Sequence, residues 1–328
     1  MALKWGIAAS GKISQDFVTA VSALPKLDHQ VVAIAARSQS SADKFAKEHN
    51  VPVAYEGYEK LAKDVNVQVV YIGVLNPQHY EVTKLMLENG KHVLCEKPFT
   101  LNEQQTRELL DLAKQKNLFL MEAIWSRCFP VYDELKKILD SGELGTIYQV
   151  SVNFGFPLQN IERLTAKNLG GGATLDLGVY VLQLQQFVYR GLQPSKVLAG
   201  GHLNSQGTDS VANAIILYPE GKTATVTATA IVQAQNEAVI SGTKGSVRIP
   251  NFWCPTQIIK NGQTINFPLI ENKKKFNYFN SAGLAYEAEE VRKCIGSGRL
   301  ESEKLPHKET LQLSQLMDSL RKQIGVTE

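Results

Sequence analysis

The sequence has 328 residues, which is too long for one ordinary hydrophobic core, so we expect two domains. It is 44% hydrophobic and 20% charged, and no apolar run approaches the ~20 residues of a membrane helix, so its composition is that of a globular protein. The net charge of +3, with one dense basic run at 273–275, is too small for a nucleic-acid interface, and we interpret that run as a solvated loop.

The four cysteines are scattered along the chain without a CxxC pair. This spacing argues against a disulfide framework and against a zinc site, and it suits a reducing compartment. The first residues, MALKWGI, enter a strand pattern without the apolar core of a signal peptide, and the last, IGVTE, carry no lipidation signal. We therefore expect a cytoplasmic protein without a metal site.

From residue 3 to about residue 122, strand patterns alternate with helix patterns. The strands are near-continuous runs of Val, Ile, Ala and Leu, as in strands that are buried on both faces. Alternation at this spacing predicts an α/β fold, with a doubly wound parallel Rossmann sheet formed by residues 1–123. The predicted strands are LKWGIAA, HQVVAIAAR, VQVVYIGV, HVLCEK and LFLMEAI.

The pattern changes after about residue 124. Past a helix at 131–140, several segments alternate with period two, most plainly TATVTATAIVQAQ from Thr223, in which Thr and apolar residues occupy opposite faces. Two helix patterns, at about 281–294 and 307–323, close the chain. We predict that residues 124–328 form an α+β domain with a large, mostly antiparallel open sheet.

The first strand leads into GIAASGKIS, which has the spacing of the dinucleotide fingerprint G-x-G-x-x-G with alanine in place of the middle glycine. Such a turn brings a pyrophosphate against free N–H groups at a helix N-terminus. Because a strand precedes the turn and a helix follows it, we expect it to bind a dinucleotide. The predicted contacts are Gly6, Ala8, Ser10, Gly11, Lys12 and Ile13.

The end of the second strand indicates which dinucleotide binds. A carboxylate at this point would hold the ribose 2′-hydroxyl of NAD. The sequence instead has Arg37, followed by Ser38 and Ser41, and guanidinium and hydroxyl groups suit a 2′-phosphate. We therefore expect NADP as the cofactor, with an ordinary surface arginine as the alternative reading.

Two further strand ends supply candidates. In GVLNPQHYEV, Asn76 can cap the next helix, and both Asn76 and His79 are also candidates for cofactor contact. In HVLCEKPFT, Pro98 fixes the backbone of Lys97 at the carboxyl end of a strand, where ligands of parallel sheets lie. Glu96 and Lys97 are therefore added to the predicted cofactor contacts.

The segment GGGATLDLGVYVLQ leads through three glycines to a helix start. Asp176 and Tyr180 lie four residues apart, hence on one helical face, and both are polar within an apolar run. Taken alone, the segment favours a structural interpretation, in which Asp176 is a first-turn acid and Tyr180 is a core tyrosine whose hydroxyl group has a hydrogen-bond partner.

The sequence resembles the glucose–fructose oxidoreductase/inositol dehydrogenase/MocA family. The likeness is carried by five segments that occur in the family's order: the glycine turn GIAASGKIS, CEKP, AIWSRCFP, GGGATLDLGVY and SGTKG. The resemblance covers nearly the whole chain and implies a dehydrogenase that transfers hydride between a secondary alcohol and NADP. Two features point to one subgroup of this family. They are the segment LFLMEAIWSR, and Tyr180 at a position where the family more often has histidine. They imply substrates such as trans-dihydrodiols of aromatic hydrocarbons, or D-xylose and related aldoses.

By the same resemblance, Lys97, Asp176 and Tyr180 occupy catalytic positions, and the bond between Lys97 and Pro98 is cis. Ser41 departs from relatives that carry a second phosphate-binding arginine, which makes the preference for NADP less strict. The resemblance also implies an aromatic substrate pocket lined by Trp125, Phe154, Trp253 and Tyr278.

Oxidation of an alcohol leaves a hydroxyl proton that some group must accept. Tyrosine, with a pKa near 10, is a poor base at neutral pH, but an adjacent ammonium group lowers that pKa. We therefore assign Tyr180 as the general base, Lys97 as its electrostatic partner and Asp176 as the orienting group. A proton relay through Lys97 is the alternative.

Two other functions stay open from the sequence: a sugar or inositol dehydrogenase of the same fold, and a non-catalytic NADP-sensing regulator. We expect a small-molecule substrate and neither nucleic acid nor membrane as a partner. The strand at 223–235 has one small, weakly polar face that can pack against a copy of itself, which predicts a homodimer through the C-terminal sheet. A sheet face left in water is the alternative.

Overall fold

The computed structural model describes residues 2–327, which form two compact units. The chain builds most of the first unit, then most of the second, and then returns to the first before it ends in the second. The division of function at residue 123 stays a prediction. The first unit comprises residues 2–100, 104–128 and 269–310, and the second comprises 101–103, 129–268 and 311–327.

The first unit is built on a six-stranded parallel sheet with the strand order β3-β2-β1-β4-β5-β6. This confirms the predicted Rossmann sheet. The sequence pattern missed β3 (Val53–Glu56), because its four edge residues are half-buried or exposed and form no continuous apolar run. The other strands are β1 (Leu3–Ala8), β2 (His29–Ala36), β4 (Val69–Ile72), β5 (His92–Glu96) and β6 (Leu120–Ala123).

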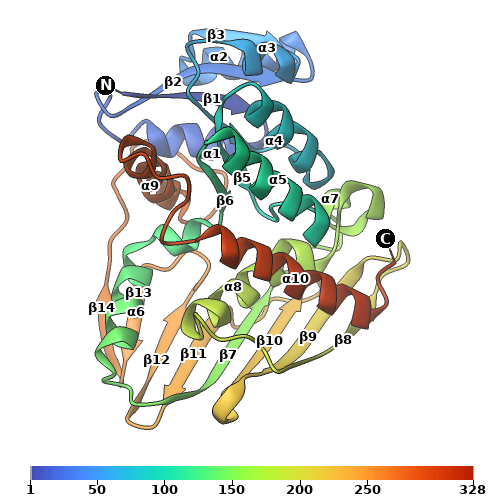
Figure 1. The fold of residues 1–328 in the computed structure, drawn as a ribbon, viewed down its shortest axis with the longest axis vertical. Coiled ribbons are helices and arrows are strands. Elements are labelled where there is room, and N and C mark those ends of the chain that lie inside the picture. Colours follow the sequence, from blue (N-terminus) through green and yellow to red (C-terminus); the bar gives the residue numbers. More distant parts are fainter. Residues whose placement is uncertain (1, 328) are drawn as a thin grey trace. The chain divides into compact units, whose positions relative to one another are not determined.

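Helices flank this sheet, as the strand–helix alternation predicts (Figure 1). Buried aromatic rings pack α1, the helix that follows the glycine turn, against the sheet. Phe17 on α1 stacks on Tyr71 with ring centroids 3.8 Å apart, and it packs edge-on against Trp5 with centroids 5.1 Å apart. The helices are α1 (Lys12–Val21), α2 (Gln39–His49), α3 (Tyr58–Lys63), α4 (His79–Glu88), α5 (Glu103–Lys116) and α9 (Leu284–Gly296).

The second unit contains an eight-stranded sheet with the order β14-β13-β12-β11-β7-β10-β9-β8. Every neighbouring pair is antiparallel except β7 and β10, so the predicted mostly antiparallel sheet is confirmed. The strands are β7 (Ile147–Gly155), β8 (Lys196–Leu203), β9 (Asp209–Leu217), β10 (Thr223–Thr229), β11 (Glu237–Gly242), β12 (Gly245–Pro250), β13 (Gln257–Lys260) and β14 (Gln263–Asn266). The helices are α6 (Pro130–Ser141), α7 (Glu162–Thr165), α8 (Val179–Val188) and α10 (His307–Ile324), whose first residues belong to the first unit.

The two faces of this sheet differ. Along β10, Ala224, Val226 and Ala228 are buried, whereas Thr223, Thr225 and Thr227 on the other face are half-buried, which confirms the predicted alternation. Helix α8 packs on β7 and β10. Within residues 2–327, no helix combines the length and the apolar character that crossing a membrane requires.

Candidate active site

The predicted dinucleotide turn lies between β1 and α1. A Cβ atom at Gly6 would come within 2.8 Å of a methyl group of Val67, so this first glycine is required by close packing. Gly11 precedes α1, and no side chain caps the helix, nor does its first turn hold an acidic residue. The N–H groups at the start of α1 are therefore suited to an anion such as a pyrophosphate.

The backbone of this turn is strained at a residue that the sequence did not single out. Ala9 has a φ of +88°, in the left-handed region that non-glycine residues rarely adopt. Its N–H donates to the carbonyl of Ala35 at 2.9 Å, which holds it against β2. Strain of this kind is stored at functional turns, so Ala9 belongs to the candidate cofactor site.

The end of β2 gathers a cation and several hydroxyl groups. Arg37 is exposed, and the Ser38 hydroxyl lies 2.9 Å from that of Ser41 and 3.2 Å from that of Ser40, at the N-terminus of α2. Burial raises the pKa of Tyr58, and the nearby charge of Arg37 partly offsets that rise. The first turn of α2 has no acidic residue, so this cluster offers only groups that an anion favours.

The loop after β4 is tied to the Lys97 segment. Asn76 is half-buried at the start of a short 3-10 turn, and His79 begins α4 with only 1% of its surface exposed. The ring nitrogens of His79 lie 2.7 Å from the carbonyl oxygen of Pro98 and 3.2 Å from that of Val74. Burial lowers the pKa of His79 to about 4, so the ring is neutral and serves to hold the Pro98 backbone.

Lys97 follows the last residue of β5, and the bond between Lys97 and Pro98 is cis, as the resemblance implied. The backbone N–H of Lys97 donates to Glu96 at 3.3 Å, and the Tyr71 hydroxyl donates to the same carboxylate at 2.5 Å. The Glu96 carboxylate therefore stabilises the turn that carries Lys97, and Lys97 itself is half-buried.

Two buried acids that sequence reasoning missed lie close to this turn. Glu122 accepts the N–H of Phe99 at 3.0 Å, and burial raises the pKa of its carboxyl group to about 7. Glu287 on α9 is fully buried, and within residues 2–327 neither of its carboxyl oxygens has a hydrogen-bond partner. Burial, and then the charge of Glu96, raise the pKa of Glu287 well above its usual range.

In the second unit, Asp176 and Tyr180 lie at a helix start, as predicted, but the first turn is wider than expected. A π-helical turn (Thr174–Gly178) carries Asp176 and continues directly into α8, which carries Tyr180. Such π turns occur frequently at functional sites. Arg163 on α7 reaches Asp176 with its Nη1 atom 3.4 Å from Oδ1, and no sequence pattern marked Arg163.

Tyr180 lies at the edge of an aromatic cluster that is centred on Phe154. The ring of Phe154 meets those of Trp253, Phe252 and Tyr180, with centroids 4.6, 5.3 and 5.7 Å away. The structure therefore brings together Phe154 and Trp253, two of the four residues predicted to line a substrate pocket.

Trp125 and Tyr278 belong to the first unit. Trp125 is buried in a short 3-10 turn, with 7% of its surface exposed. Tyr278 is 44% exposed, and its backbone N–H donates to the buried carboxylate of Asp16 on α1 at 2.9 Å. The Asp16 carboxylate also accepts the backbone N–H of Asn277 at 2.7 Å, so the segment that carries Tyr278 is fixed to α1.

Comparison with known proteins defines the class to which this fold and these residues belong. Residues 3–124 match the oxidoreductase family with an NAD-binding Rossmann fold, and residues 132–248 match the GFO/IDH/MocA C-terminal domain. The chain belongs to the GFO/IDH/MocA family of oxidoreductases. Its Rossmann unit is thus the binding domain for a nicotinamide cofactor.

The relatives narrow the likeness further. Trans-1,2-dihydrobenzene-1,2-diol dehydrogenase from Xenopus tropicalis is 43% identical over 328 residues, covering 100% of this chain and 99% of that protein. The enzyme of the same name from Homo sapiens is 42% identical and covers 100% of this chain and 98% of its own length.

Solved structures of more distant proteins share the fold. The 3-ketoreductase KijD10 from Actinomadura kijaniata, in complex with NADP and TDP-benzene, has a TM-score of 0.82 at 22% identity, covering 99% of this chain and 98% of its own. Levoglucosan dehydrogenase, in complex with NADH and levoglucosan, has a TM-score of 0.86 at 19% identity, with 98% and 97% of the chains covered.

Proposed function

We propose that this protein is an NADP-dependent dehydrogenase that oxidises the CH–OH group of trans-dihydrodiols of aromatic hydrocarbons, or of D-xylose and related aldoses. The observation that carries the proposal is the Tyr180 side chain, which lies against the aromatic cluster around Phe154 and one helical turn from the Arg163–Asp176 ion pair. The full-length likeness to dihydrodiol dehydrogenases supports the same substrate class.

Three residues divide the catalytic work in this proposal. Tyr180 accepts the hydroxyl proton of the alcohol as general base. Lys97 supplies the positive charge that favours the phenolate form and binds the substrate hydroxyl group. Asp176, whose carboxylate is fixed by Arg163, orients the substrate. When bound, a nicotinamide would accept the hydride that leaves the alcohol carbon. The alternative assignment is that Lys97 relays the hydroxyl proton.

The preference for NADP over NAD is supported by the end of β2. An exposed guanidinium group and three neighbouring serine hydroxyl groups suit a 2′-phosphate, and an NAD enzyme would be expected to place a carboxylate there. Ser38 also has a structural role, because its hydroxyl group caps α2 by accepting the N–H of Ser41 at 3.3 Å. Arg37 is therefore the residue that decides the choice.

The substrate side is supported by aromatic side chains. Phe156 and Phe252 extend the cluster of Phe154 and Trp253, so the side of Tyr180 that faces Phe154 is apolar. An apolar diol is favoured by such surroundings, although sugars also stack on aromatic faces. The second candidate is therefore a sugar dehydrogenase.

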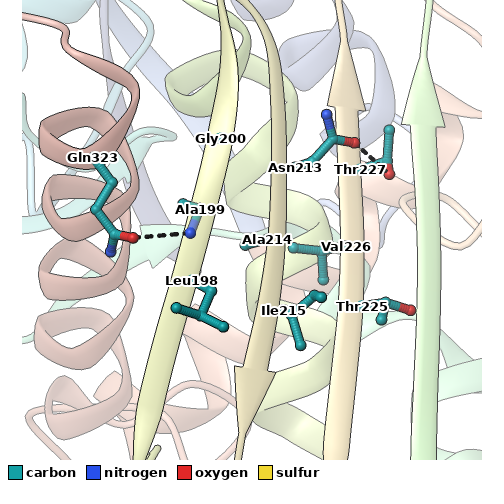
Figure 2. A pocket seen from close by; sticks show the side chains of 10 residues that line it. All are labelled: Leu198, Ala199, Gly200, Asn213, Ala214, Ile215, Thr225, Val226, Thr227 and Gln323. Carbon is teal, nitrogen blue, oxygen red and sulfur yellow. Dashed lines mark hydrogen bonds between the residues drawn. The ribbon is translucent and has the colours of Figure 1, made fainter.

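A homodimer through the C-terminal sheet is part of the proposal. A hollow on β8, β9 and β10 is lined mostly by small and aliphatic residues, and Leu198 and Ile215 in it are 44% and 45% exposed (Figure 2). A two-fold arrangement of such a face against itself would cover these side chains. A cytoplasmic location is supported by the cysteines, which are buried and scattered along the chain without a CxxC pair, as suits a reducing compartment.

Initial rates of NADP⁺ reduction with a trans-benzene dihydrodiol and, separately, with D-xylose test the proposal. We expect turnover with the diol to exceed that with the sugar. Turnover with D-xylose alone would select the sugar dehydrogenase. Tight NADPH binding without turnover on either substrate would contradict the enzymatic role and favour the NADP-sensing regulator.

A further inference from the structure

The turn between β8 and β9 (204–208) is fixed to α7. The side-chain amide of Asn204 and the hydroxyl of Thr208 both donate to the carbonyl of Thr165, each at 3.0 Å. The turn is also closed on itself, because Asn204 Oδ1 accepts the N–H groups of Gln206 and Thr208 at 2.9 and 3.1 Å. Thr165 is the last residue of α7, which carries Arg163, so the turn holds the helix that supplies one partner of the ion pair.

The residue directly after the turn, at the start of β9, holds the segment that carries the other partner, Asp176. Asp209 is 2% exposed, and its Oδ2 atom accepts both the backbone N–H and the hydroxyl of Thr174, each at 2.6 Å. Thr174 is the first residue of the π-helical turn that carries Asp176 and leads into α8 with Tyr180. A carboxylate at a helix N-terminus is favourable, and these short, charge-assisted hydrogen bonds fix where the helix begins.

The glycines of GGGATLDLGVY permit this close approach. Gly172 has a φ of +132°, and a Cβ atom there would come within 2.4 Å of Oδ1 of Asp209. A Cβ atom at Gly171 would come within 2.8 Å of the backbone of Leu164 on α7. The carbonyl of Gly172 in turn accepts the N–H of Asp176 at 3.1 Å. Gly171 and Gly172 therefore permit tight packing against α7 and Asp209.

We infer that Asp209 is a positioning residue for the reaction: it sets the register of the helix that carries Asp176 and Tyr180, while the turn directly before it sets the position of Arg163. This turn and Asp209 thus fix both sides of the Arg163–Asp176 pair. The inference rests on the proposed function, because Asp176 and Tyr180 take their roles from it.

Three substitutions and one control test it. Asp209→Asn removes the charge and keeps one acceptor, and Thr174→Val removes one of the two donors. Thr174→Ser restores that donor and is the conservative rescue. Tyr189→Phe is the matched control, because it removes a buried 3.1 Å hydrogen bond to the Thr223 carbonyl at the opposite end of α8.

We expect Asp209→Asn to lower kcat by about tenfold to a hundredfold, as small misplacements of catalytic groups do, with an unchanged dissociation constant for NADPH. Thr174→Val loses part of kcat, Thr174→Ser recovers it, and Tyr189→Phe lowers the melting temperature while kcat stays at the wild-type value. If Asp209→Asn and Thr174→Val lower only the melting temperature, as the control does, Asp209 has a merely structural role and the inference is wrong.

Hydrogen exchange of the amides at 173–178 decides the anchoring independently of turnover. We expect these amides to exchange faster in Asp209→Asn than in wild type and in Tyr189→Phe. If the wild-type protein oxidises no diol or sugar, the proposed function fails and exchange alone tests the anchoring. Unchanged exchange overturns the inference in either case.

Discussion

The hydroxyl group of Tyr71 donates a 2.5 Å hydrogen bond to Glu96, the residue directly before Lys97. The same carboxylate accepts the Lys97 N–H at 3.3 Å, so Tyr71 in β4 is linked through Glu96 to the turn at the end of β5. The Tyr71 ring also stacks on Phe17 of α1. A single buried side chain thus joins the helix of the dinucleotide turn to the segment that carries the proposed catalytic lysine.

Tyr71→Phe removes the hydroxyl group and keeps the ring. We expect a loss of about 2 kcal/mol of unfolding free energy in urea titrations, since a hydrogen bond to a charged group contributes this much. Turnover is expected to fall as the Lys97 turn loosens. Tyr55→Phe is the control, because Tyr55 makes a similar 3.2 Å bond to Asp64 near the far edge of the sheet. Equal turnover in both variants would contradict the link to Lys97.

The buried acid Glu122 predicts a pH dependence of stability. Its folded pKa is raised to about 7, above the ordinary 4.5, so the folded state binds the proton more tightly than the unfolded state. Stability from this group is fully present below the unfolded pKa and is lost as the pH rises through the folded pKa, by an amount of order 3 kcal/mol.

Urea unfolding of wild type and Glu122→Gln at pH 5 and at pH 8 measures this effect. Glutamine keeps an acceptor for the Phe99 N–H and cannot ionise, so we expect the variant to gain stability relative to wild type as the pH rises. Glu108→Gln, at an exposed acid, serves as the control and should show no such gain. A difference between Glu122→Gln and wild type that does not change with pH would show that Glu122 does not titrate in this range.

Arg37 predicts the choice of cofactor. Arg37→Asp places a carboxylate where the proposal puts the 2′-phosphate, and the loss of a charged contact there corresponds to roughly tenfold to a hundredfold in affinity. We expect the ratio of kcat/KM for NADP⁺ to that for NAD⁺ to fall by this factor, with NAD⁺ used at least as well as before. A ratio that stays the same would assign the phosphate to other residues.

The outer face of the C-terminal sheet predicts the oligomeric state. Ile215→Lys places a charge in the middle of the proposed dimer face, and sedimentation velocity should show a monomer where the wild type is a dimer. Val65→Lys is the control, because Val65 is an apolar residue that is 90% exposed in the first unit. A wild type that sediments as a monomer at low concentration would contradict the dimer outright.

The sequence predicted both sheets because their strands carry clear patterns, continuous apolar runs in the first unit and period-two alternation in β10. It missed β3, whose four residues are half-buried or exposed. It also gave no sign that α9 packs with α1, since that contact joins segments about 270 residues apart.

Only part of the candidate site could be predicted, because sequence patterns show local features and not contacts between distant segments. Residues at strand ends and in glycine-rich turns, such as Lys97 and Asp176, stand out in a local pattern. Arg163, Asp209 and Glu287 do not, because each acquires its surroundings only when distant segments fold together. Gly172 shows this most clearly, because its packing role depends on Asp209, which lies 37 residues later in the chain.

In the proposed reaction, Tyr180 accepts the proton from the alcohol. The most direct test is the rate of NADPH formation in a single turnover with a trans-benzene dihydrodiol, in wild type and in Tyr180→Phe. Tyr218→Phe is the control, because it removes a buried phenolic hydroxyl group that donates to Gln185 on α8, the helix that also carries Tyr180. We predict a rate on the order of 100-fold lower for Tyr180→Phe, with unchanged NADPH binding and a wild-type rate for the control. A wild-type rate in Tyr180→Phe would contradict the account and move the proton to Lys97.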